Sequence, residues 1–117
     1  MAKNQRYTNA THIELTFPYA RLAGEPVRVG SICGIALNDT ANGARGTVWL
    51  DGSWDVQVTG AVATEGLPVY ITAAGALNVT ATGNYRFGTA LSTKAGATIG
   101  TVEVAPIGYT DQTAVGA

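Results

Sequence analysis

Few residues of this 117-residue chain have the type and spacing that catalysis or metal binding requires. The only histidine, His12, has no second histidine or cysteine to complete a metal site. The only cysteine, Cys33, lies in the apolar run SICGIAL, where we expect a small buried thiol and not a nucleophile. Asp51 and Asp55 suggest paired carboxylates, but aspartate at a turn usually accepts a local backbone hydrogen bond. We therefore predict no enzyme, no cofactor and no metal ion.

Three aromatic residues are the remaining candidates for a binding surface. Trp49 and Trp54 flank the dipeptide Asp51-Gly52, and Tyr70 lies in the later segment GLPVYIT. Such rings are normally part of a core or a subunit interface, so we take all three as candidates for an oligomer interface or a contact surface. A platform for a sugar or a nucleobase is the alternative interpretation.

The composition excludes several classes of partner. Charged residues make up 13% of the chain and the formal net charge is −1, whereas nucleic-acid binding needs clustered lysine and arginine. No segment is apolar enough to span a bilayer, and the first residues contain no apolar core of a signal peptide. We expect the product to remain in the cytoplasm unless it is carried out inside something else, and we expect no membrane partner. Much of its surface should consist of small, neutral side chains, which suit packing against other proteins.

Short alternating segments predict β-strands throughout the chain. Residues 11–17 place Ile13, Leu15 and Phe17 on one side, and similar segments recur at spacings near those of small sandwiches and barrels. Asp51-Gly52 predicts a hairpin between the strands on either side of it. Residues 60–66 are the one candidate for a helical turn. The expected fold is all-β, a small antiparallel barrel or sandwich of about eight or nine short strands.

Two short sequences occur twice. GEPVRVG at residues 24–30 is matched by GLPVYIT at residues 66–72, and CGIAL at residues 33–37 is matched by FGTAL at residues 87–91. In the first pair glycine supplies a free turn and proline presets φ where a strand begins. The copies are 42 and 54 residues apart, which excludes a fixed-period solenoid and leaves an internal duplication open.

The two ends of the chain differ from the middle. Residues 1–10 are polar and without periodicity, so we interpret them as an extended N-terminal arm that orders on a partner. We assign residues 11–104 to one β domain and residues 105–117 to a C-terminal tail.

The chain resembles the small capsid cement or decoration proteins of tailed bacteriophages. The resemblance rests on the polar opening MAKN, on GEPVRVGSICGIAL, on the block WDVQVTGAVATEGLPVYITAAGALNVT, and on FGTAL with the closing strand TVEV. It implies a structural protein of the virion that binds the outer surface of the assembled head, through contacts with the major capsid protein and with its own copies, commonly as a trimer or another small oligomer. On this basis we expect a capsid-binding arm formed by Ala2, Lys3, Asn4, Gln5, Arg6, Tyr7, Thr8 and Asn9, with Tyr7 as its aromatic anchor.

Three other functions stay open at this point. A β-sandwich module for carbohydrate would use Trp49, Trp54 and Tyr70. A tail or baseplate subunit would share the structural role but not the place in the virion. A small enzyme with an unrecognised site is the third.

Overall fold

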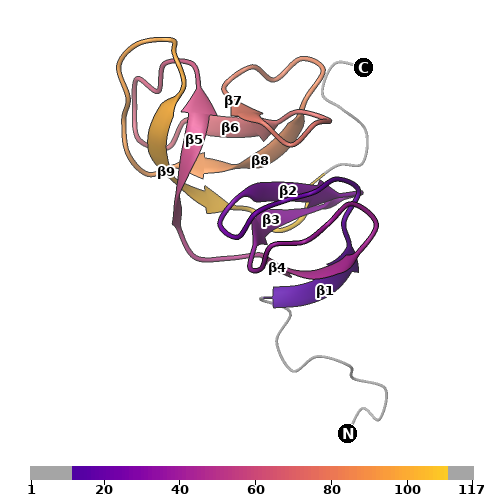
Figure 1. Ribbon diagram of the computed structural model, residues 1–117. Coiled ribbons are helices and arrows are strands. Elements are labelled where there is room, and N and C mark those ends of the chain that lie inside the picture. Colours follow the sequence, from indigo (N-terminus) through magenta and orange to yellow (C-terminus); the bar gives the residue numbers. More distant parts are fainter. Residues whose placement is uncertain (1–11, 111–117) are drawn as a thin grey trace, which may run out of the picture.

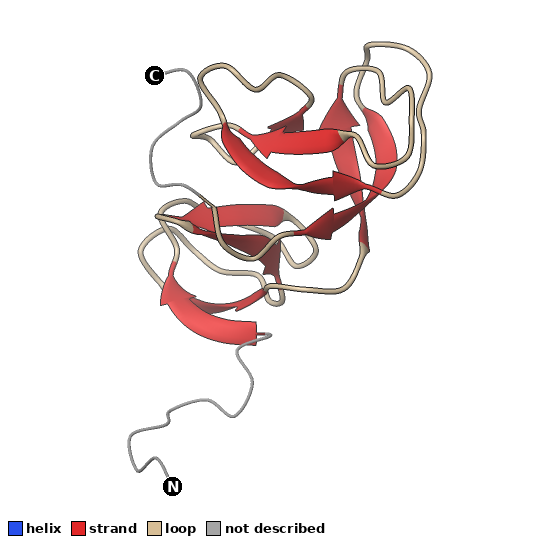
Figure 2. Ribbon diagram, turned by 180° about the vertical axis from the view of Figure 1, so that it is seen from behind, coloured by secondary structure: helices blue, strands red, loops and turns tan. Residues whose placement is uncertain are grey.

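A computed structural model describes residues 12–110, which form nine strands and no helix (Figures 1 and 2). The strands are β1 (His12–Thr16), β2 (Pro26–Val29), β3 (Ile32–Ala36), β4 (Arg45–Trp49), β5 (Trp54–Thr59), β6 (Pro68–Ile71), β7 (Leu77–Asn78), β8 (Tyr85–Ala90) and β9 (Gly100–Pro106). The predicted all-β fold is confirmed. Both Pro26 and Pro68 are the first residue of a strand, where the missing N–H costs no ladder hydrogen bond.

The strands form two lobes. The first lobe, residues 12–50, is an open antiparallel sheet with the strand order β1-β4-β3-β2. The second lobe, residues 54–106, is a closed barrel with the order β5-β7-β6-β8-β9, in which only the short β5–β7 pair is parallel. Figure 1 shows the barrel above the sheet, with β9 running down toward the first lobe.

The predicted hairpin at Asp51-Gly52 is wrong. Strand β4 pairs with β1 on one side and β3 on the other, so neither of its edges is left for β5. Strand β5 pairs instead with β7 and β9. Gly52, with φ of 80°, turns the chain between the lobes. The dipeptide therefore makes the tight turn that its residues favour, but the turn links two sheets.

The candidate helical turn at residues 60–66 is not formed. The segment makes bends and turns, and Val62 forms an isolated antiparallel bridge with Lys94. The Val62 side chain is 1% exposed and packs in the core of the barrel. Two backbone hydrogen bonds of 2.9 Å between Val62 and Lys94 also hold this loop against the barrel.

The two lobes repeat one four-stranded arrangement. Antiparallel neighbours run β1-β4-β3-β2 in the first lobe and β5-β9-β8-β6 in the second. The register agrees at the start of these strands, because Val27 lies opposite Gly34 in the first lobe and Val69 lies opposite Gly88 in the second. A β-bulge between Val69 and Tyr70 then shifts the register in the second lobe alone. The internal duplication that the sequence left open is therefore present in the fold.

Turns and loops are duplicated as well. Gly24 and Gly66 both have φ of +88°, and their N–H groups donate to the carbonyl oxygens of Ala36 and Ala90 at 2.8 and 2.7 Å. The bridge between Val62 and Lys94 has its counterpart in the first lobe between Arg21 and Thr40. Equivalent loops are thus closed by equivalent backbone pairs.

The main difference between the lobes is an insertion that carries β7. The offset between the copies rises from 42 residues (24 to 66) to 54 residues (33 to 87), so twelve residues are inserted between β6 and β8. In the first lobe the same connection is the turn at residues 30–31. Strand β7 pairs with both β5 and β6 and so closes the second lobe into a barrel. Without it the first lobe stays open.

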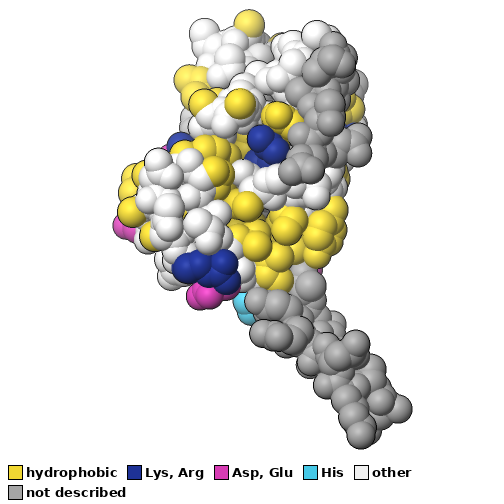
Figure 3. Space-filling view, turned by 90° about the vertical axis from the view of Figure 1, so that its right-hand side faces the viewer, with side chains coloured by type: hydrophobic (Ala, Val, Ile, Leu, Met, Phe, Trp, Pro, Cys, Tyr) yellow, Lys and Arg dark blue, Asp and Glu magenta, His cyan; other side chains and the backbone are white. Residues whose placement is uncertain are grey.

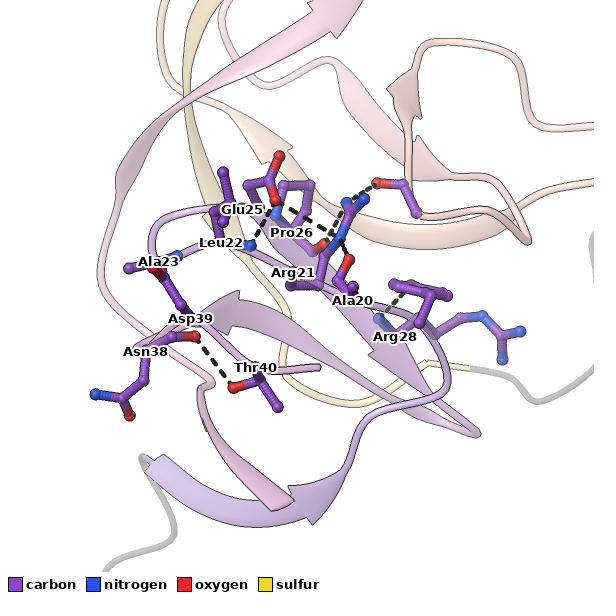
Figure 4. Close-up of polar contacts among 12 residues, drawn as sticks. Ala20, Arg21, Leu22, Ala23, Glu25, Pro26, Arg28, Asn38, Asp39 and Thr40 are labelled. Atoms are coloured by element: carbon purple, nitrogen blue, oxygen red, sulfur yellow. Dashed lines mark hydrogen bonds and ion pairs between the residues drawn. The ribbon is translucent and has the colours of Figure 1, made fainter. Parts of the chain in front are cut away.

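Side chains protect the outer edge of β2 in the open lobe. The Tyr19 hydroxyl oxygen accepts the N–H of Arg28 at 2.9 Å, and Arg21 Nη1 donates to the carbonyl oxygen of Pro26 at 3.2 Å (Figure 4). The equivalent strand β6 pairs with β7 through Tyr70 on this side. Exposed strand edges invite pairing with other chains, and these two side chains occupy the edge groups of β2.

The lobes share packing and polar contacts. Cys33 of β3 is fully buried and joins the core of the second lobe beside Phe87. The guanidinium carbon of Arg28 lies 3.6 Å from the centroid of the Tyr85 ring, and Arg21 Nη1 donates to the carbonyl oxygen of Gly75 at 3.3 Å. The second core cluster, centred on Phe17, belongs to the first lobe alone.

Candidate docking surface

The described residues contain no group of three or more histidine, cysteine, aspartate or glutamate side chains placed to hold a metal ion. Cys33 is 0% exposed, and its Sγ donates to the carbonyl oxygen of Phe87 at 3.5 Å. Burial raises the pKa of the Cys33 thiol to about 12. Because the thiolate is the reactive form, this cysteine is a packing residue, as predicted.

Three rings gather where the two lobes are linked. His12 is exposed and stacks on Trp49 with 4.9 Å between ring centroids, and Trp49 meets Trp54 edge to face at 5.9 Å. We call His12, Trp49 and Trp54 the aromatic cluster. Asp51 holds it in place, because Trp49 Nε1 donates to Asp51 Oδ1 at 2.9 Å and Trp54 Nε1 donates to the Asp51 carbonyl oxygen at 3.0 Å. Both indole donors are thus engaged within the chain.

Tyr70 does not belong to this cluster. It lies half-buried on β6, where it is paired with Asn78 of β7 and Arg86 of β8. Among the described residues no ring contact joins it to either tryptophan. The three aromatic residues predicted as candidates therefore occupy two separate places on the molecule.

The paired carboxylates considered from the sequence serve different purposes. Asp51 accepts the Trp49 indole hydrogen bond, which is the local role expected of aspartate at a turn. Asp55 is exposed on β5 and lies opposite Glu103 of β9. Glu103 in turn accepts a hydrogen bond of 2.7 Å from the Ser53 hydroxyl. This arrangement is that of a polar sheet surface.

The predicted capsid-binding arm, Ala2 to Asn9, lies outside the described residues. The described chain begins at His12, which stacks on Trp49. The predicted β domain ended at residue 104, whereas β9 continues to Pro106 and Tyr109 forms an isolated bridge with Ile32.

Large apolar side chains are exposed at several places on the molecule. They are Leu22, Leu37, Leu91, Ile99, Ile107 and Tyr109, with exposed fractions between 41% and 65%. Figure 3 shows one face with a broad apolar area and few charged side chains. An apolar, sparsely charged surface of this kind is typical of proteins that bind other proteins.

A shallow cleft lies between the lobes. It has a volume of about 320 Å³ and is lined by the loop at residues 21–26, by β5, by the turn before β7, and by Ile99. Arg21 crosses the boundary between the lobes here, with hydrogen bonds to both and an ion pair of 3.8 Å with Glu25 (Figure 4). Arg21 therefore links the two lobes at this cleft.

No helix among residues 12–110 is long and apolar enough to cross a membrane. Comparison with curated proteins and with solved structures finds no match. A profile for a family described as phage cement protein does match, over residues 7–106. The match covers both lobes and confirms the resemblance seen in the sequence. This chain belongs to the phage cement protein family, whose members are structural proteins that stabilise the phage capsid.

Proposed function

We propose that the protein binds the outer surface of the assembled phage head and stabilises it through contacts with the major capsid protein and with its own copies. The observation that carries this proposal is the family match across residues 7–106. Exposed apolar side chains such as Leu37, Leu91 and Ile107 and the low charge of the chain support it, because they suit shallow contacts with a large protein surface.

Attachment after assembly favours an oligomer. A protein that recognises a finished shell must bind where several shell subunits meet, and symmetry multiplies weak contacts into a stable attachment. We propose a trimer, with Trp49, Trp54 and Tyr70 as the candidates for contacts between copies or with the shell. The aromatic cluster suits such a contact because its rings are partly exposed and its indole N–H groups need no external partner.

The N-terminal arm is the second proposed point of attachment. Residues 2–9 carry Lys3, Arg6 and Tyr7 and no acidic side chain. We propose that they lie along the major capsid protein, with Tyr7 as the anchor, since an extended segment can pair with an exposed strand edge. The carbohydrate-binding alternative has less support, because the aromatic cluster holds both indole donors within the chain and Tyr70 lies apart from it.

The test is binding to heads that lack the protein. Purified wild-type protein is mixed with such heads, and occupancy is measured by sedimentation and imaged by cryo-electron microscopy. Wild type should decorate the outer surface, and a variant lacking residues 2–9 should remain folded but lose binding. Wild-type protein that fails to decorate heads would refute the proposed function. Full occupancy by the shortened variant would refute the role of the arm alone.

A further inference from the structure

The duplication makes it possible to ask which residues are identical at equivalent positions of the two lobes. Equivalent positions are those that share register across the repeated ladders. Within these ladders and the residues that bond directly to their ends, the identical pairs are Gly24 and Gly66, Pro26 and Pro68, Val27 and Val69, Gly34 and Gly88, Ala36 and Ala90, Leu37 and Leu91, and Val48 and Val104.

All but one of these pairs have a reason within the fold. The first glycines adopt positive φ and the prolines begin strands. The valines and alanines are at most 1% exposed. A Cβ at Gly34 or at Gly88 would lie 2.2 or 2.3 Å from a backbone oxygen of the next strand. Buried volume and close backbone approach therefore explain these identities.

Leu37 and Leu91 are the exception. Each follows directly after its strand, β3 or β8, and each is 41% exposed. The N–H of Leu37 donates to the carbonyl oxygen of Thr47 at 2.9 Å, and the N–H of Leu91 donates to that of Glu103 at 2.7 Å. Any residue except proline makes this backbone bond, so the fold alone gives no reason for a large apolar side chain at either place.

We infer that Leu37 and Leu91 are two equivalent contact points that bind the same feature on two copies of one partner protein. The partner must itself be repeated in space, because the two leucines belong to repeated backbone positions of one chain. A shell built from many copies of one subunit meets this requirement. The inference rests on the proposed function and names the two side chains through which one copy would contact two shell subunits.

Bridging predicts a particular pattern of loss. Once one leucine is bound, the second binds at a high effective concentration, so both contribute to attachment. Removing one leucine contact leaves the protein attached through the other alone, and removing both leucines abolishes both contacts. Burying one leucine side chain corresponds to roughly a 10- to 100-fold change in affinity. The two single substitutions are therefore expected to have similar effects.

The experiment compares Leu37→Asp, Leu91→Asp, the double variant and Leu22→Asp as full-length proteins. Leu22 is the matched control, because it is 62% exposed and its position in the repeat carries no second leucine. Circular dichroism and urea unfolding establish that each variant is folded, and occupancy on heads lacking the protein gives the affinity. Leu37→Ala and Leu91→Ala serve as milder variants if an aspartate variant fails to fold.

We expect each single variant at position 37 or 91 to weaken binding at least tenfold, the double variant to weaken it far more, and Leu22→Asp to bind like wild type. Wild-type occupancy by the double variant would overturn the inference and leave the proposed function standing. Loss at only one of the two positions, or an equal loss with Leu22→Asp, would overturn it as well. Failure of wild-type protein to bind heads would instead count against the proposed function.

Discussion

Replacement of Gly88 by alanine tests whether the close approach of β8 and β9 holds the barrel together. A Cβ at Gly88 would lie 2.3 Å from the carbonyl oxygen of Ala105 and 2.9 Å from the Cα of Pro106, and both are backbone atoms that no side-chain rotation can move. Strand β9 must retreat, which costs about 1–3 kcal/mol in strain. Losing one ladder hydrogen bond adds about 1 kcal/mol. The lower entropy of the unfolded alanine chain returns about 0.4–1 kcal/mol.

The expected net loss in the free energy of unfolding for Gly88→Ala is about 1–4 kcal/mol, with a midpoint of ~2 kcal/mol. Urea unfolding followed by tryptophan fluorescence measures it. Gly96→Ala is the control, because that glycine has positive φ but nothing within 4 Å of a Cβ, and should cost about 1 kcal/mol. Gly34→Ala should match Gly88→Ala, since its Cβ would lie 2.2 Å from the Trp49 carbonyl oxygen. If Gly88→Ala were no more destabilising than Gly96→Ala, the argument from backbone contact would be refuted.

Two further predictions concern the junction between the lobes. Burial raises the pKa of Cys33 to about 12 from 9.0, so the thiol ionises in the unfolded chain first and the free energy of unfolding should fall between about pH 9 and pH 12. Cys33→Ala should remove that part of the pH dependence in urea titrations, and an unchanged slope would contradict the assignment. Arg28→Met should lose about 1–2 kcal/mol from the contact with Tyr85, and a double-mutant cycle with Tyr85→Leu should give a coupling of that sign. A coupling near zero would show that the 3.6 Å contact adds nothing.

The strands could be predicted from the sequence because their causes are local. Alternation places Ile13, Leu15 and Phe17 toward one core, and proline marks the first residue of β2 and of β6. The pairing of strands could not be predicted in the same way. A turn dipeptide favours a hairpin only when the strands beside it have free edges, and β4 has none because β1 and β3 occupy both of its sides. Local turn chemistry carries no information about those distant partners.

The candidate surface shows the same limit. The nearness of Trp49 and Trp54 followed from their places beside one turn, but the role of Asp51 in binding both indole groups depends on backbone geometry that only the fold supplies. Leu22 and Ile99 are indistinguishable by type from core residues, yet they are 62% and 65% exposed. The echo of CGIAL in FGTAL was visible in the sequence. Only the strand register of the two lobes shows that Leu37 and Leu91 occupy equivalent positions.

Two-point attachment works only if the lobes keep a fixed separation, because a flexible link lowers the effective concentration of the second contact. Three features meet this condition. Cys33 of the open lobe packs in the core of the barrel. The Cys33 N–H donates to the carbonyl oxygen of Gly108, which follows β9, at 2.9 Å. The guanidinium group of Arg28 lies over the Tyr85 ring of the barrel. The sheet and the barrel are thus packed as one body. A substitution at this junction should weaken attachment to the head even where it leaves both leucines in place, because it changes the spacing that the two contacts require.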